Sequence, residues 1–150
     1  MKISSPAFAD GSAIPENFTK NGGNASPPLE WAGAPEGTRS FALVVEDPDA
    51  PSGMFRHWAV YNVPAERTSL SENEDVSDFG LGANDFGHNR YDGPKPPPGH
   101  GVHHYHFRVA ALDTDHLENL PDGATAEAVW NAARRHAIDE AELVGTYEAR

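Results

Sequence analysis

The stretch SFALVVED at Ser40–Asp47 has the strongest strand pattern in the sequence, and PDAP at positions 48–51 follows it directly. A short apolar run rich in β-branched residues and closed by turn residues is typical of a buried strand. The two prolines make a rigid corner where the chain turns. The strand ends on Asp47, a carboxylate at the end of an apolar row, where a charge is costly unless it is paired.

Outward from this strand, short apolar runs separated by turn residues recur along the chain. They predict strands at His57–Val63 and His104–Leu112, and weaker strands near Ile3–Phe8 and Leu143–Tyr147. Glycines and prolines are spread along the chain without forming one linker, so we expect a single domain over residues 1–150. Short strands divided by turns predict an all-β sandwich or barrel.

One helix interrupts the strand pattern. From Ala126 to Ala137 the apolar residues follow a three–four spacing, and Thr125 is a suitable N-cap. We expect the apolar stripe of this helix to pack on a sheet. The segment Ser71–Arg90 is polar and glycine-rich, and we expect a long loop with at most one short strand.

The amino-acid composition argues against several classes of binding partner and of active site. Asp and Glu total 23 against 11 Lys and Arg, which gives a formal net charge of −12. This balance argues against nucleic acid and against an anionic membrane surface, because both attract cationic proteins. The absence of cysteine excludes disulfides, thiolate catalysis and zinc–cysteine sites. No signal-peptide pattern or bilayer-length apolar stretch is present, so we expect a cytoplasmic protein without membrane insertion.

The alternation of side chains across a strand sorts the candidate functional residues. Asp47 shares a face with the apolar residues of its strand, and His103 and Tyr105 share the inward face of the later strand. His104 and His106 point outward. This sorting holds unless a bulge intervenes. It favours two surface histidines over a cupin-type metal site for the His-x-His pair.

The inward residues leave two functions open. Asp47, His57 and His103 have the residue types of a two-His-one-carboxylate metal site. With Tyr105, the same residues can form an anion pocket in which imidazole and hydroxyl groups donate hydrogen bonds. Ser52 adds the residue type of a catalytic triad, but the sequence has no Gly-x-Ser-x-Gly elbow to support nucleophilic catalysis.

Three blocks of the sequence resemble the signature of the phosphatidylethanolamine-binding protein family: DPDAP at 47–51, HWAVYNVP at 57–64 and GPKPPPGHGVHHY at 93–105. Their order and spacing match as well. The flanks are similar to the bacterial and archaeal Raf kinase inhibitor-like branch, including SPPLEW at 26–31, NDFG at 84–87 and AELVGTY at 141–147. The resemblance covers essentially the whole chain.

The resemblance implies a mostly β fold, a β-sandwich with one or two peripheral helices and a small anion pocket at one end. That pocket takes phosphate-type groups, including phospholipid headgroups. Carried over by position, the ligand-binding residues are Asp47, His57, Gly93, His103 and Tyr105, with Phe55 at the rim.

The resemblance also implies binding without catalysis and without a cofactor. Regulation of a kinase or a protease through a protein partner is a further role in the family, and prokaryotic relatives often form homodimers. Lys95 departs from the Cys of many bacterial relatives, and it either adds positive potential near the anion or points to solvent. The alternative function is a metal-dependent enzyme built on Asp47, His57 and His103.

Overall fold

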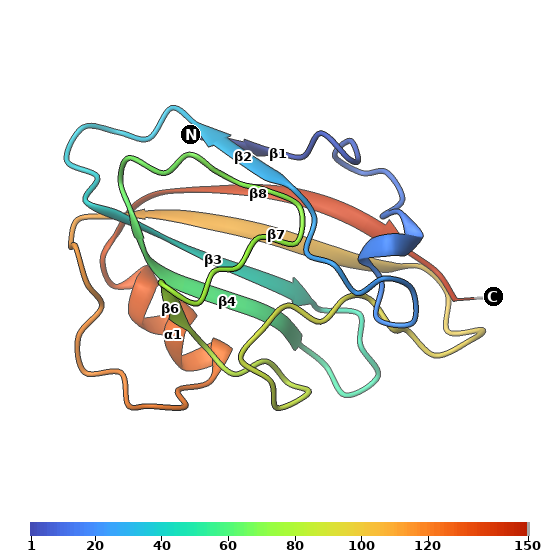
Figure 1. Ribbon diagram of the computed structural model, residues 1–150. Helices are drawn as coiled ribbons and strands as arrows, with labels where there is room; N and C mark the ends of the chain where they lie inside the picture. The colour runs from blue at the N-terminus through green and yellow to red at the C-terminus, as the bar shows by residue number, and fades with distance from the viewer. Residues whose placement is uncertain (150) are drawn as a thin grey trace.

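The computed structural model describes residues 1–149 and is built from two antiparallel β-sheets with one α-helix outside the larger sheet (Figure 1). The large sheet has the strand order β6-β4-β3-β7-β8, and the small sheet has the order β1-β2-β5. The strands of the large sheet are β3 (Ser40–Asp47), β4 (Phe55–Pro64), β6 (Gly80–Leu81), β7 (His103–Leu112) and β8 (Ala137–Tyr147). The other elements are β1 (Lys2–Ser4), the 3-10 helix η1 (Glu16–Phe18), β2 (Leu29–Ala32), β5 (Ser69–Leu70) and α1 (Ala126–Arg134).

Strand β3 lies between β4 and β7 and is buried over its whole length. Both of its faces are covered, which explains why its sequence is a continuous apolar run rather than an alternating one. Phe41, Leu43 and Val45 belong to the core between the sheets. Ala42 and Val44 belong to the core under the helix. One strand therefore forms part of both cores.

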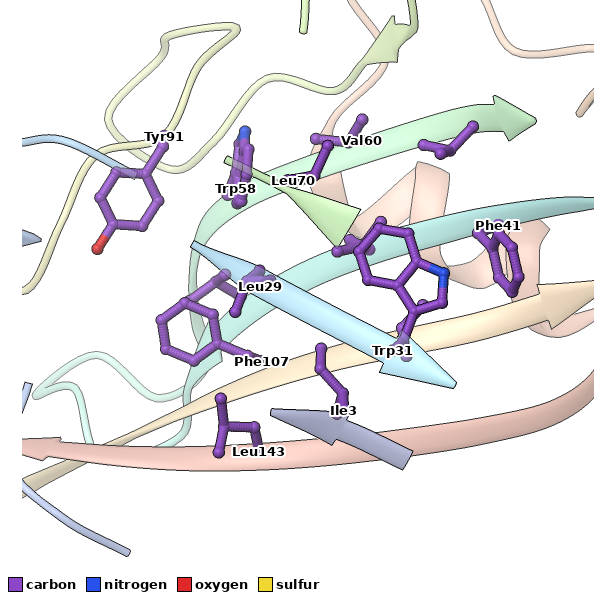
Figure 2. Close-up of a cluster of buried hydrophobic side chains, with 14 of the residues drawn as sticks. Ile3, Leu29, Trp31, Phe41, Trp58, Val60, Leu70, Tyr91, Phe107 and Leu143 are labelled. Atoms are coloured by element: carbon purple, nitrogen blue, oxygen red, sulfur yellow. The ribbon is translucent and has the colours of Figure 1, made fainter. Parts of the chain in front are cut away.

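The first core fills the space between the two sheets. Figure 2 shows Ile3 and Trp31 of the small sheet facing side chains of the large sheet, among them Phe41 and Phe107. The rings of Trp31 and Phe41 meet in a T-shaped arrangement with their centroids 5.6 Å apart, a geometry that aromatic pairs prefer. This packing holds the small sheet on the large one.

The second core lies between α1 and the opposite face of the large sheet. Val129 and Trp130 of the helix pack in one cluster with Ala42 of β3. The Thr125 hydroxyl accepts a hydrogen bond from the backbone N–H of Ala128 at 3.1 Å. The predicted N-cap is thus confirmed, and the apolar stripe of the helix packs on the sheet as expected.

The mostly β architecture predicted from the sequence is confirmed, with differences at its boundaries. The helix ends at Arg134, and Ala137, predicted as the last residue of its stripe, instead begins β8. Strand β8 therefore starts well before the predicted Leu143. Residues 137–142, which precede the predicted start, include three acidic side chains. Charged side chains are common on exposed edge strands, and here they interrupt the apolar pattern by which a strand is recognised in the sequence. No helix within residues 1–149 has the length and apolar character needed to span a bilayer.

Candidate functional site

The ends of three strands meet at one edge of the large sheet, on the right in Figure 1. Strand β3 ends there, and β4 and β7 begin there. Antiparallel pairing places Asp47 opposite Phe55 and Glu46 opposite His106. Side chains that are far apart in the sequence therefore converge at this edge, and the segments that follow β3 and precede β7 close over them.

A cavity of about 240 Å³ lies at this edge. The predicted residues that line it are Asp47, Phe55, His57, His103 and Tyr105. The turn after β3 and the proline-rich segment before β7 complete the wall, and Lys95 of that segment is one of the lining residues. The cavity is smaller than the range of roughly 300–1,000 Å³ typical of drug-sized ligands, so it suits a small group.

Gly93 lies outside the cavity lining. A Cβ atom at this position would lie 2.0 Å from the carbonyl oxygen of Phe18, so the close approach of two backbones requires glycine. The Gly93 N–H donates to the Asn24 side-chain oxygen at 2.7 Å. The structure therefore gives Gly93 a packing role behind the wall, and the ligand contact that the resemblance implies stays a prediction.

A register shift in the β3–β4 pairing aims His57 at the cavity. Val45 pairs with Trp58 and Glu46 pairs with Arg56, so His57 between them has no partner on β3. An extra residue of this kind is a β-bulge, which often turns a side chain toward a functional site. Trp58 consequently packs in the core between the sheets, while its neighbour His57 lines the cavity.

The protonation of His57 follows from its surroundings. Its Nδ1 lies 2.8 Å from the carbonyl oxygen of Asp92, which can only accept, so Nδ1 carries the hydrogen. Burial lowers the pKa of His57, despite the opposing effects of that carbonyl and of the Asp47 charge. The neutral ring therefore has a lone pair at Nε2, and it becomes a donor to an anion only after taking up a proton.

Asp47 and His103 form a buried pair. Asp47 accepts from the backbone N–H of Asp49 at 2.8 Å and from His103 Nδ1 at 2.7 Å. Asp47 is 3% exposed and His103 is 1% exposed. Both carboxylate oxygens thus have a partner, as a carboxylate removed from water requires. His103 Nε2 in turn lies 2.6 Å from Nδ1 of His100.

Tyr105 contributes a hydroxyl group to the cavity. The residue is 1% exposed, and its hydroxyl makes no hydrogen bond to any residue between 1 and 149. Its ring meets the His57 ring edge-on, with the centroids 5.3 Å apart. Burial raises the pKa of Tyr105, and the nearby Asp47 charge raises it further, so the hydroxyl keeps its proton.

Phe86 is a lining residue that sequence reasoning missed. Its ring contacts Phe55 edge-on at 4.8 Å between centroids and lies 5.6 Å from the His57 ring. The Lys20 ammonium group lies 4.7 Å from the centroid of the Phe86 ring. The signal was the NDFG block at 84–87, which belongs to the family resemblance but carried no predicted role.

Asp92 is a second residue near the cavity that the sequence did not predict. The residue is 0% exposed, and its carboxylate is surrounded by side-chain donors from two segments of the chain, 20–24 and 84–90. These donors belong to Lys20, Asn24, Asn84, His88 and Arg90. Burial alone raises the pKa of Asp92, but the hydrogen bonds outweigh burial and hold it well below its usual range. Because its carbonyl oxygen binds His57, Asp92 links these segments to the cavity.

The metal-dependent alternative is not supported by the geometry. Residues 1–149 contain no group of three His, Asp or Glu side chains arranged to hold a metal ion. Asp47 is bonded to His103, whereas His57 is oriented by a carbonyl oxygen. A catalytic triad of Ser52, His57 and Asp47 is not supported either, because the His57 ring is hydrogen-bonded to the Asp92 carbonyl oxygen and not to Asp47.

The outward histidines lie where alternation placed them, but each has a carboxylate partner. His104 Nδ1 lies 2.8 Å from Asp49, and His106 is bonded to Glu142. The His104 side chain holds the pKa of Asp49 below its usual value. These residues stabilise the outer face of the sheet and take no part in the cavity.

Comparisons with known proteins agree with this geometry. The family model described as phosphatidylethanolamine-binding protein matches residues 4–148. A protein of Methanothermobacter thermautotrophicus named UPF0098 protein is 44% identical over 154 residues, which cover 98% of this chain and 98% of that protein. The crystal structure of E. coli YbcL, described as a new member of the mammalian PEBP family, superimposes with a TM-score of 0.91 at 34% identity, covering 99% of this chain and 98% of YbcL.

A relative from Mycobacterium tuberculosis bears on the expected location. It is 39% identical over 148 residues, covering 99% of this chain and 72% of that protein, and it is named lipoprotein LppC. A cytoplasmic location for the present chain therefore stays a prediction. The family model, the relatives and the shared fold extend over nearly all of the sequence. The chain belongs to the phosphatidylethanolamine-binding protein family.

Proposed function

We propose that the chain reversibly binds a small oxyanion or a phosphate-type headgroup in the cavity of about 240 Å³, without converting it. The observation that carries this proposal is the Tyr105 hydroxyl, which belongs to a residue lining the cavity and is not hydrogen-bonded to any residue within 1–149. It is therefore available to donate a hydrogen bond to an oxygen atom of a ligand in the cavity.

The other polar groups of the cavity complement a phosphate-type group. His57 Nε2 accepts from a protonated ligand oxygen, or donates to an anionic oxygen once the ring is protonated. Lys95 lines the rim and is exposed, and it forms no ion pair with a residue between 1 and 149. Its charge attracts an anion to a protein whose formal net charge is −12.

The dimensions of the cavity limit the size of the ligand. Its volume equals that of about eight water molecules at roughly 30 Å³ each. Phe55 and Phe86 pack against each other at the wall and restrict the space beside His57. These limits favour a headgroup or an inorganic oxyanion over an entire lipid.

The absence of a free catalytic group favours binding over turnover. Asp47 has a partner at each carboxylate oxygen, and both ring nitrogens of His103 lie within hydrogen-bonding distance of a neighbour. His57 is the remaining base in the cavity. Within residues 1–149, no nucleophile of the kind that covalent catalysis needs is hydrogen-bonded to the His57 ring.

Calorimetry with inorganic phosphate, O-phosphoethanolamine and sulfate tests the proposal. Removing the donor in Tyr105→Phe should weaken binding by about 10- to 100-fold, because a hydrogen bond to a charged group contributes roughly 1.5–3 kcal/mol. Tyr61→Phe is the matched control, since Tyr61 packs beside the helix and does not line the cavity. Equal affinity of the parent and Tyr105→Phe would contradict the site, and release of phosphate from O-phosphoethanolamine would contradict binding without conversion.

A further inference from the structure

His100 lies outside the cavity but contacts a residue that lines it. Its Nδ1 is 2.6 Å from His103 Nε2, and His103 Nδ1 is 2.7 Å from a carboxylate oxygen of Asp47. Asp47 and His103 are buried, whereas His100 is exposed. Two successive hydrogen bonds therefore join an imidazole in solvent to the carboxylate of the cavity.

The positions of the hydrogens follow from the acceptors. An ionised Asp47 can only accept, so His103 Nδ1 carries a hydrogen and donates it. In the neutral ring of His103, Nε2 then has a lone pair and accepts from the Nδ1–H group of His100. His100 keeps a lone pair at its own Nε2. Because His100 is exposed, this nitrogen is the point at which solvent can add a proton.

Addition of one proton reverses the central hydrogen bond without requiring a side chain to move. The proton adds to His100 Nε2, and the hydrogen on His100 Nδ1 passes to His103 Nε2. His103 is then an imidazolium that donates to Asp47 through Nδ1 and to His100 Nδ1 through Nε2. His100 is again neutral, now with its hydrogen on Nε2. The total charge of the three side chains changes from −1 to 0 in this step.

We propose that His100 and His103 form one proton-binding pair, in which His100 stabilises protonated His103 by accepting its Nε2–H group, so that anion binding takes up one proton and neutralises the Asp47–His103 pair. This inference rests on the proposed anion site. Asp47 lines the cavity that the anion enters, and like charges in one site disfavour each other's ionised forms. An imidazolium beside Asp47 removes this repulsion, and imidazole changes charge within the neutral pH range.

Other titratable and charged groups also face His103. They are Asp47 from β3, Asp49 from the turn after it, His57 from β4, Tyr105 from β7 and Lys95 from the proline-rich segment. Asp49 is paired with His104, and the Tyr105 hydroxyl keeps its proton. His57 is the one competing proton acceptor in this set, and it has no hydrogen-bonded route through His100.

The test measures proton uptake during sulfate binding by calorimetry in buffers of different ionisation enthalpy. Sulfate is the probe because its own charge does not change over the neutral range. The variant is His100→Gln, whose side-chain amide can still donate to His103 Nε2 but cannot carry a proton. The control is His116→Gln, since His116 is exposed and does not line the cavity.

The parent and His116→Gln should take up about one more proton per bound sulfate than His100→Gln does. The affinity of the parent should fall up to about tenfold further per pH unit above neutrality than that of His100→Gln. Sulfate binding with equal proton uptake in the parent and His100→Gln overturns the role of His100 and leaves the anion site intact. Failure of the parent to bind sulfate, phosphate and O-phosphoethanolamine overturns both.

Discussion

Two buried aspartates act on His57, Asp92 through its carbonyl oxygen and Asp47 through its charge, and the surroundings of their two carboxylates differ. Asp92 is 0% exposed and accepts hydrogen bonds from five surrounding side chains. Asp47 is 3% exposed and has one backbone N–H and one imidazole as partners. The donors of Asp92 include lysine and arginine, which stay charged at neutral pH, whereas the imidazole beside Asp47 can exchange its charge.

Because of these different partners, we assign the Asp92 carboxylate a structural role and propose a functional role for the Asp47 carboxylate. The Asp92 carboxylate ties the segment around Lys20 and Asn24 to the segment around Asn84 and His88. Its carbonyl oxygen then fixes the orientation of His57. The Asp47 carboxylate joins the end of β3 to His103 at the start of β7, and Asp47 lines the cavity itself. Asp92 therefore stabilises the segments beside the cavity, whereas Asp47 contributes its charge to the cavity itself.

The largest expected effect comes from Asp92→Asn. This change removes the carboxylate that forms ion pairs with Lys20, His88 and Arg90, and loss of one partner in a buried ionic network costs about 3–5 kcal/mol. Urea unfolding should show a loss of this order. Asp115→Asn is the control, because Asp115 forms an exposed pair with Arg39 that contributes less than about 1 kcal/mol. Similar losses of unfolding free energy in Asp92→Asn and Asp115→Asn would contradict the structural role of Asp92.

His57→Ala should separate binding from stability. The variant removes an imidazole ring that lines the cavity, so phosphate binding should weaken by about 10- to 100-fold, which corresponds to roughly 1.5–3 kcal/mol. Titration calorimetry measures this change. Unaltered phosphate affinity in His57→Ala would show that the ring takes no part in the site, even if the fold is intact.

The smallest effect is a change in the acid sensitivity of folding. The pKa of Asp92 is depressed in the folded state, so its stabilising contribution is complete above the unfolded pKa of about 3.9 and is lost as the pH falls below it. The contribution of this one group changes by at most about 1.4 kcal/mol per pH unit. The slope of unfolding free energy between pH 4 and 2 should therefore be steeper in the parent than in Asp92→Asn, and equal slopes would contradict the depressed pKa.

Sequence reasoning succeeded for strands with simple pairing. Alternation placed Asp47, His103 and Tyr105 inward, and β3 pairs with β7 without a register shift. It could not place His57, because the bulge in β4 breaks the alternation at that residue. His57 was a candidate because of its residue type, and the family resemblance implied the same residue.

Residues contributed by irregular segments were beyond the sequence pattern. Phe86, Asp92 and His100 lie between regular elements, and their positions depend on contacts with distant parts of the chain. Gly93 was assigned to the pocket by resemblance, but its required closeness to Phe18 becomes visible only when the two backbones are seen together. A periodic pattern carries no information about such contacts.

The central claim is that a phosphate-type anion occupies the cavity lined by His57, His103 and Tyr105. The most direct measurement is a phosphate titration followed by NMR of the histidine ring nitrogens. The account predicts saturable shifts of the His57 and His103 signals, with the signal of exposed His116 unchanged. Saturating phosphate that leaves His57 and His103 unshifted would contradict the account.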